Sequence, residues 1–205
     1  MRLRNLALAG LAVLLLAGGC VKRVMVPPVI DLKAHEGIGL IEVKPNTDGK
    51  LDRYVTHKFL QAITEDQRDA QIFELGTAAK VLADVQKTEL DMEAVKAACE
   101  KYGVKSIVTG ELFVSDVRPK IDVGFGLSSL RVKADVEANL TAKLFDAGGA
   151  TIWTGSSQAK ETVGEVGIFG GGHFSFDAKD PESAYGPLIR SLVHRATRDY
   201  RVTWQ

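Results

Sequence analysis

The sequence predicts an α+β fold in which helices cover a mixed β-sheet that ends in a long antiparallel C-terminal meander. Three observations support this prediction. Segments with helical spacing alternate with short β-prone runs over residues 38–103. Strict alternation of apolar and polar residues follows over 113–125 and 132–144. The segment after Asp180 has helical spacing again. Strands and helices in this order favour a sheet with helices on one or both faces.

The first strand is expected over the short apolar run 38–43, which the turn-forming residues 45–49 end. Apolar residues at helical spacing predict a helix over 51–66, and residues 72–75 predict a second strand.

Two further helices are expected, over 77–87 and from Asp91 to Gly103. Asp91 is a favourable N-cap, and Gly103 is typical of the position that follows a helix C-terminus. Cys99 lies within the apolar stripe of the second helix. We expect it to be a buried small hydrophobic residue and not a reactive thiol.

The alternating segments predict two long strands, each with one apolar and one polar face. The expected apolar face of the first is Phe113, Ser115, Val117, Pro119, Ile121, Val123 and Phe125. That of the second is Val132, Ala134, Val136, Ala138, Leu140, Ala142 and Leu144. A turn at residues 146–149 leads into a third strand through Ile152 and Trp153.

A glycine-rich stretch, residues 164–172, separates this meander from the last predicted helix. That helix begins at Asp180-Pro181, an N-cap followed by proline at the first helical position. Its expected apolar face is Leu188, Ile189, Leu192, Val193 and Ala196.

The N-terminus has the pattern of a bacterial secretory signal. Arg2 and Arg4 precede an apolar run, and the small residues Ala17, Gly18 and Gly19 come directly before Cys20. The apolar run over 6–19 is shorter than the roughly 20 residues of a membrane-spanning helix. We therefore expect a signal peptide over 1–19, an extended tether with Pro27-Pro28 over 20–35, and a single domain over 36–205.

The residues around Cys20 resemble the lipobox of exported lipoproteins, although Ala17 stands where that motif usually has Leu. The resemblance implies that Cys20 becomes the N-terminus and carries fatty acyl chains such as palmitate. Two or more chains hold a protein stably on a membrane. No Asp follows Cys20, which by the same resemblance implies sorting to the periplasmic face of the outer membrane.

Composition narrows the possible functions. The full chain has 26 basic and 26 acidic residues. Removing residues 1–19 takes away Arg2 and Arg4 and leaves 24 basic and 26 acidic residues. A nearly neutral chain provides no basic field for nucleic acid. If Cys20 is acylated, Cys99 is the only free thiol, so neither an intramolecular disulfide nor a cysteine-based metal site can form.

No catalytic grouping is found in the sequence. The histidines are far apart and form no metal-binding motif; they are His35, His57, His173 and His194. We expect His57 and His194 to be solvated on helices. Gly170–Gly172 and His173 precede no helix start, so they do not predict a phosphate site. The carboxylates Asp116, Asp122 and Asp135 fall on polar strand faces. We expect no enzyme activity, cofactor or metal.

Residues 103–112, 136–149 and 152–156 resemble strands in a family of bacterial envelope lipoproteins. This family includes the curli secretion-pore lipoprotein, the penicillin-binding-protein activators and the N-terminal domain of the Tol-system β-propeller protein. The resemblance covers roughly residues 36–200. It implies a periplasmic domain similar to an anticodon-binding fold, without catalytic residues.

Two functional hypotheses follow. The first is a lipid-anchored, non-catalytic binding or assembly module that contacts other envelope proteins. The second is a subunit of a homo-oligomeric outer-membrane secretion channel, in which segments 113–135 and 156–178 form membrane hairpins. Residues 113–125 are long enough to cross a bilayer, whereas 156–162 show no apolar stripe. An envelope enzyme is the third and least favoured reading.

Overall fold

The computed structural model describes residues 24–120, 133–169 and 173–204. These residues form two compact units. The described part of the smaller unit contains the strands β1 (Met25–Val26) and β11 (Thr203–Trp204), which pair antiparallel. The larger unit extends from Pro28 to Arg201 and contains the main sheet and the helices.

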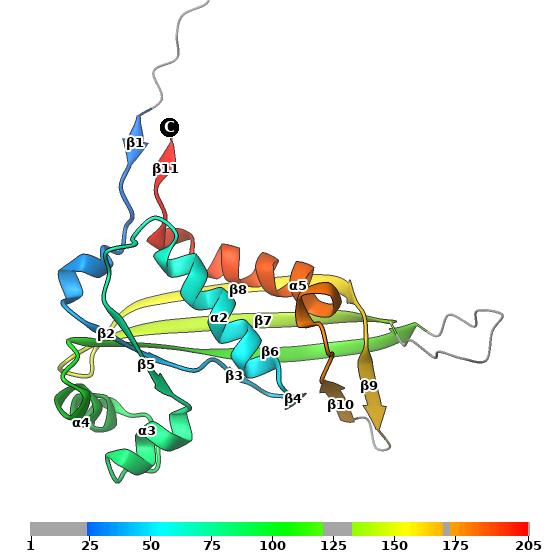
Figure 1. Cartoon of the computed structure of the whole chain (residues 1–205), viewed down its shortest axis with the longest axis horizontal. Helices are drawn as coiled ribbons and strands as arrows, with labels where there is room; N and C mark the ends of the chain where they lie inside the picture. The colour runs from blue at the N-terminus through cyan, green and yellow to red at the C-terminus, as the bar shows by residue number, and fades with distance from the viewer. Residues whose placement is uncertain (1–23, 121–132, 170–172, 205) are drawn as a thin grey trace, which may run out of the picture. The chain divides into compact units, whose positions relative to one another are not determined.

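The main sheet is mixed, as predicted, with the strand order β5-β2-β6-β7-β8 (Figure 1). The strands are β2 (Ile38–Ile41), β5 (Ile72–Gly76), β6 (Ser106–Lys120), β7 (Lys133–Asp146) and β8 (Thr151–Val163), and β3 (Lys44–Pro45) also pairs with β6. The first strands, β5, β2 and β6, are parallel neighbours, whereas β6, β7 and β8 form an antiparallel meander. This confirms the predicted α+β class and the C-terminal meander.

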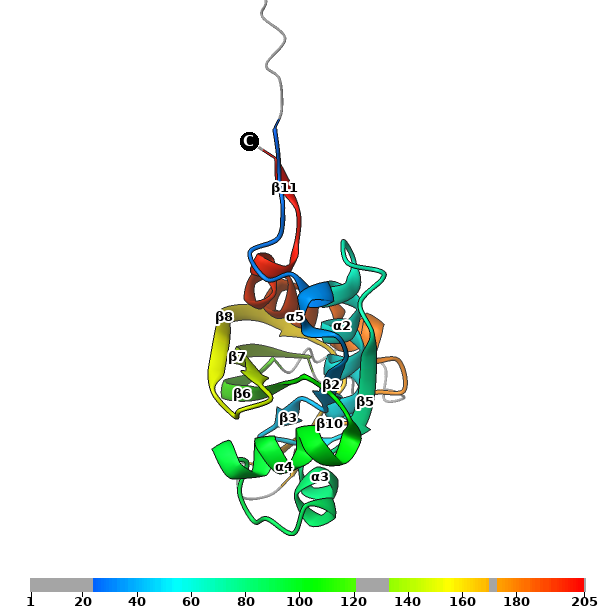
Figure 2. The same cartoon turned by 90° about the vertical axis from the view of Figure 1, so that its left-hand side faces the viewer.

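Four α-helices are found in the described residues: α2 (Leu51–Thr64), α3 (Ala78–Asp84), α4 (Met92–Tyr102) and α5 (Pro181–Ala196). Figures 1 and 2 show α2 and α5 side by side on one face of the sheet, with α3 and α4 on the other. Two hydrophobic cores result. The larger joins α2 and α5 to β6, β7 and β8, and the smaller joins α3 and α4 to β2, β5 and β6. All of β2 is buried because helices cover both of its faces.

The predicted helix ends are confirmed at two helices. The carboxylate of Asp91 accepts a hydrogen bond from the backbone N–H of Ala94 at 2.8 Å, and Gly103 ends α4 with φ of 68°. The carboxylate of Asp180 accepts one from the N–H of Ser183 at 3.2 Å, and Pro181 occupies the first turn of α5. Both contacts satisfy N–H groups that have no partner within the helix.

The alternation predicted for β7 is confirmed over its described length. The buried side chains are Ala134, Val136, Ala138, Leu140, Ala142 and Leu144. Several of them are small, so α5 packs closely on this face: its residues Leu188, Ile189, Leu192 and Val193 are buried in the same core.

The expected apolar face of β6 is wrong at Phe113 and Ser115 and right at Val117 and Pro119, because a β-bulge interrupts the strand. Val114 pairs with Ala138 and Asp116 with Glu137, so Ser115 has no opposite residue in the register of β7, although its hydroxyl donates to the carbonyl of Glu137 at 3.1 Å. An extra residue moves every following side chain to the opposite face. Phe113 is therefore 55% exposed, whereas Val117 pairs with Val136 on the core face. Residues 121–132, including the rest of this expected stripe, lie outside the described residues.

Two strands that the sequence did not predict lie in the glycine-rich stretch and directly after it. β9 (Val166–Phe169) and β10 (His173–Phe176) pair antiparallel, and β10 pairs in parallel with β4 (Asp48–Gly49). Gly49 has φ of +113°, and a Cβ there would lie 2.3 Å from the carbonyl oxygen of Phe176. Only glycine fits this contact.

Part of the segment expected to be a tether packs on the domain. Leu32 begins the 3₁₀ turn η1 (Leu32–His35) and is 1% exposed in the larger core. The N–H of Ile30 donates to the carbonyl of Asp199 at 3.0 Å. The folded unit thus includes residues that precede the first predicted strand.

Candidate functional site

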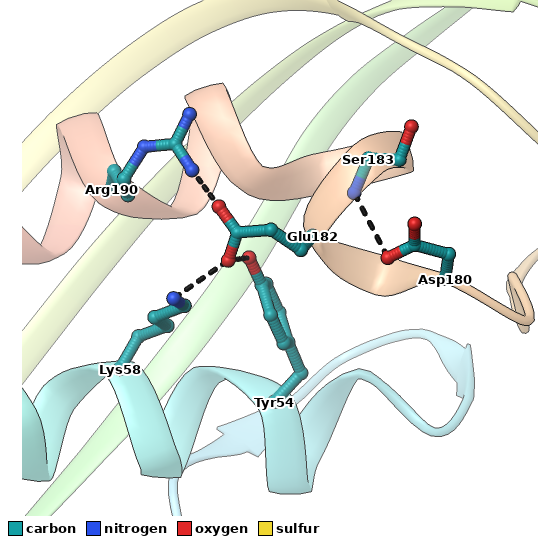
Figure 3. Close-up of polar contacts among 6 residues, drawn as sticks. All are labelled: Tyr54, Lys58, Asp180, Glu182, Ser183 and Arg190. Carbon is teal, nitrogen blue, oxygen red and sulfur yellow. Dashed lines mark hydrogen bonds and ion pairs between the residues drawn. The ribbon is translucent and has the colours of Figure 1, made fainter.

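The helices α2 and α5 are linked by one carboxylate, that of Glu182 in the first turn of α5 (Figure 3). It accepts a hydrogen bond from the hydroxyl of Tyr54 at 2.9 Å and pairs with the Nζ atom of Lys58 at 2.6 Å. It also pairs with Arg190, two turns further along α5. Two cations and a phenol on adjacent helices therefore share one anion.

The Tyr54 hydroxyl is held in its neutral form. Its partial burial raises the pKa of Tyr54, because burial disfavours the charged phenolate. The nearby Asp180 raises this pKa further, while Arg190 opposes the effect. Tyr54 is therefore a hydrogen-bond donor to Glu182 at neutral pH and not a base.

A groove of about 550 Å³ follows the line between the same two helices toward their C-terminal ends. Its charged lining residues are Lys58, Glu65, Arg68, Arg190 and Arg201, with His194 beside them. The C-terminal parts of both helices reach this groove, since Thr64 lines it from α2 and Val193 from α5.

A second hollow, of about 590 Å³, lies between the C-terminal end of α5 and β8. It shares His194 and Arg201 with the groove, and it adds Arg195 and Arg198. The two hollows form a continuous surface, which we call the basic face. Its cations are Lys58, Arg68, Arg190, Arg195, Arg198 and Arg201.

The basic face has an excess of positive charge although the whole chain is neutral. Three carboxylates, Glu65, Glu182 and Asp199, oppose the six cations. The ends of α2 and α5 add about half a negative charge each. A net charge of roughly +2 remains on this surface after that correction, so anionic groups are attracted to it.

Hydrogen bonds to the backbone hold Arg195 and Arg201 in place, whereas Arg68 is free of such bonds in the part of the chain that the structure describes. Arg201 donates to the carbonyl oxygen of His194 and to the hydroxyl of Thr197. Arg195 donates to the carbonyl of Gln158 at 2.9 Å. Arg68 is exposed and forms no ion pair with any residue that the structure describes. A fixed guanidinium binds carboxylate or phosphate in a defined geometry, so this face is suited to recognition of acidic groups.

The residues singled out from the sequence are not brought together. Cys20 lies outside the described residues, so its lipidation stays a prediction. Cys99 is 2% exposed, and burial, with smaller effects of Asp146 and Glu100, raises the pKa of its thiol to about 11. Cys99 is thus the buried residue that was expected.

The histidines do not converge on a shared site. His57 on α2 and His194 on α5 are exposed, as expected, and His35 lies in η1. The side chain of His173 and residues Gly170–Gly172 are not described. In the parts of the chain that are, no three His, Cys, Asp or Glu side chains are placed to hold a metal ion.

Two of the strand carboxylates form local ion pairs. Asp116 pairs with Arg118 at 2.6 Å and Asp135 with Lys120 at 2.7 Å. The hydroxyl of Thr162 also donates to Asp135, and both contacts lower the pKa of this carboxyl, that of Lys120 more strongly. These carboxylates stabilise the polar sheet face. Asp122 lies outside the described residues.

The sequence patterns did not predict the basic face. One signal was present: four arginines, 190, 195, 198 and 201, follow one another within a short C-terminal stretch. These arginines lie near Lys58 and Arg68 because α2 and α5 run parallel to each other. The spacing of residues in the sequence does not predict that arrangement. Among the described residues, no helix is long and apolar enough to cross a membrane.

Comparison with known proteins gives distant likenesses of fold only. No protein-family model matches the chain, and no curated protein does. One similar solved structure is a PelC dodecamer from Paraburkholderia phytofirmans, with 12% identity, 87% of this chain and 96% of that chain covered, and a TM-score of 0.46.

Two other similar structures are of lipoproteins or their domains. Lipoprotein GNA1162 from Neisseria meningitidis shares 14% identity over 62% of this chain and 83% of that chain, with a TM-score of 0.37. The LpoB C-terminal domain from Salmonella enterica shares 12% sequence identity over 73% of this chain and 92% of that chain, with a TM-score of 0.39. Likenesses at this level carry no conclusion about function.

Proposed function

We propose that this chain is a lipid-anchored, non-catalytic binding module of the bacterial cell envelope, at the periplasmic side of the outer membrane. The observation that carries the binding role is the basic face. It presents guanidinium groups, both fixed and free, along an open groove, and the described residues around it include no nucleophile paired with a base. The signal and Cys20 pattern support the location.

The partner that suits this face is an acidic segment of another envelope protein. Arginines bind carboxylates in a bidentate geometry, which gives both orientation and attraction. The groove between α2 and α5 has room for several side chains of such a segment. Lys58 and Arg190 are already paired with Glu182, whereas Arg68 is exposed and Arg198 stays 80% exposed although it pairs with Asp199 at 3.4 Å. We therefore expect Arg68 and Arg198 to contribute most of the attraction.

Charge reversal on the basic face tests the binding role. A photo-crosslinking amino acid at Gln61, which lines the groove, is used in cells to capture the partner. We expect a defined product, identified by mass spectrometry as a protein with an acidic segment. The double variant Arg68→Glu/Arg198→Glu should abolish it. The matched variant Lys96→Glu/Lys105→Glu, with exposed lysines outside the groove and second hollow, should leave it intact.

A crosslinked product that survives the Arg68→Glu/Arg198→Glu change would refute an electrostatic role for this face. So would a partner without an acidic segment.

The anchor is tested separately. Cys20→Ala should release the protein from the membrane fraction, because no other thiol lies near the N-terminus to carry the acyl chains. Cys99→Ala is the matched control, since the buried thiol of Cys99 is not an attachment site. Mass spectrometry of the wild-type protein should show diacylglycerol on Cys20. Retention of Cys20→Ala in membranes, or an unmodified wild-type N-terminus, would contradict the proposal.

A further inference from the structure

The small unit exposes an apolar cross-strand pair. In the ribbon of β1 and β11, Met25 is paired directly with Trp204. Directly opposed residues of two strands lie on the same face, so these two side chains are neighbours. Met25 is 56% exposed and Trp204 63%, and the preceding Val24 is 59% exposed. Three of the large exposed apolar side chains in the described structure thus belong to a unit of a few residues.

The segments that form this ribbon contain no charged residue. A quarter of the whole chain is charged, yet residues 24–30 and 202–205 have no Asp, Glu, Lys or Arg. Basic residues come directly before both segments: Lys22 and Arg23 precede the first, and Arg201 precedes the second. An uncharged stretch with exposed tryptophan and methionine next to basic residues is typical of a segment that lies in a membrane interface.

The ribbon is also close along the chain to the expected acylation site. Only residues 21–24 separate Cys20 from Met25, and five extended residues span at most about 18 Å. We propose that the β1–β11 ribbon lies in the interfacial layer of the membrane that holds the acyl chains, with Met25 and Trp204 directed into it. This inference rests on the proposed lipidation of Cys20.

The backbone of the ribbon limits its depth. Among the described residues, the two strands of two residues leave N–H and C=O groups on both outer edges without a strand partner, and such groups are unfavourable in the hydrocarbon core. The headgroup region still contains water, and tryptophan concentrates there because its ring is apolar while its N–H is polar. In an interfacial position, water can hydrogen-bond to the backbone edges of the ribbon while its apolar side chains contact lipid. A transmembrane position would leave the backbone edges without hydrogen bonds.

Tryptophan fluorescence gives a direct test, because the chain has only two tryptophans. Trp153 is 8% exposed, so Trp153→Phe leaves Trp204 as the single reporter. In the acylated protein, reconstituted into phosphatidylethanolamine–phosphatidylglycerol vesicles, we expect Trp204 emission at short wavelength and strong quenching by lipids brominated near the headgroup. Emission typical of water, without quenching, would overturn the inference.

Trp153→Phe removes a hydrogen bond to Asp199 and could disturb folding. The same quenching is therefore also measured with both tryptophans present. The accessible Trp204 should then be quenched while the buried Trp153 is not, giving a partial loss of emission. No loss of emission in this protein would overturn the inference as well.

A second experiment separates the ribbon from the lipid anchor. The Cys20→Ser chain should still bind the same vesicles weakly. Trp204→Ser/Met25→Ser should lower that affinity about tenfold or more, given the apolar area removed. Phe73→Ser, which removes an equally exposed apolar side chain from the larger unit, should not change it.

Each outcome has a distinct meaning. Equal affinities for all three variants would refute the ribbon's role even if Cys20 is acylated. A Trp204 blue shift that depends on protein concentration and not on vesicles would identify a second copy of the chain as the occupant, and it would also refute the proposal. An unmodified Cys20 in the native protein, with vesicle binding by the ribbon intact, would refute the lipidation alone.

Discussion

The side-chain Oε1 atom of Gln67 accepts a hydrogen bond from the backbone N–H of Leu32 at 2.6 Å. The Nε2 atom of the same amide donates to the carbonyl oxygens of Ile30 and Tyr200, both at 2.8 Å. Gln67 is 4% exposed and stands just after α2. One buried amide therefore ties together three segments: the N-terminal entry, the end of α2 and the turn after α5.

Replacing Gln67 should loosen this junction. Gln67→Ala leaves three backbone groups without partners, which we expect to lower the free energy of unfolding by about 3 kcal/mol. The melting temperature should fall by roughly 6–12 °C. Hydrogen exchange should show faster exchange of the Leu32 amide in particular. Gln61→Ala, on the exposed side of α2, is the control and should behave like wild type. Unchanged protection of Leu32 would show that other contacts hold the entry.

Neutralising Glu182 should affect binding more than stability. The Glu182 side chain is 46% exposed, so its ion pairs contribute about 1 kcal/mol or less. Glu182→Gln should lower the melting temperature by no more than roughly 4 °C. It should also release Lys58 and Arg190 and strengthen binding of an acidic partner, with a steeper salt dependence. Glu89→Gln, on an exposed residue outside the basic face, should change neither quantity. Weaker partner binding by Glu182→Gln would contradict this prediction.

A charge on the core face of β7 should prevent folding. Ala138 is fully buried between the sheet and α5, and a carboxylate there has no partner. The penalty of several kcal/mol is comparable to the stability of a typical domain. Circular dichroism of Ala138→Glu should therefore show loss of the cooperative transition. Asn139→Glu places the same group on the opposite face of the strand and should remain folded. A normal melting curve for Ala138→Glu would contradict this prediction, because it would show that the core face of β7 accommodates a carboxylate.

Alkaline pH should destabilise the fold partly through Cys99. The folded pKa of its thiol, about 11, lies above the ordinary value of 9.0. The unfolded chain therefore loses this proton first as the pH rises, so stability that is present below pH 9 declines between about pH 9 and 11. Denaturant unfolding across this range should show a smaller decline for Cys99→Ala than for wild type. Tyr102, whose pKa is raised to about 12 mainly by its hydrogen bond to Asp84, should produce a further decline in both proteins. Parallel pH profiles would show that Cys99 does not titrate in this way.

Local signals explain what could be predicted from sequence. The alternation of β7 and the caps at Asp91 and Asp180 depend on residues close in the chain, and the structure confirms them. The bulge at Ser115 could not be seen, because it depends on how β6 aligns with β7 and not on its own composition. The parallel pairing of β10 with β4 joins segments more than a hundred residues apart, and the glycines nearby suggested only a loop.

The candidate site was less predictable than the fold. Its cations come from α2, from the segment after it, from α5 and from residues 198–201 that follow α5. Each arginine, considered alone, is an ordinary surface residue near a helix end. Their common function depends on the parallel arrangement of α2 and α5, which Glu182 helps to hold through Tyr54 and Lys58.

The bond from Arg195 to the carbonyl of Gln158 has a consequence for self-association. In the described sheet β8 is an outermost strand, and long exposed edges invite aggregation by strand addition. The guanidinium of Arg195 occupies one of the acceptors that an incoming strand would need, and Lys160 adds a charge two residues away. Addition of a strand to this border is thereby discouraged at Gln158.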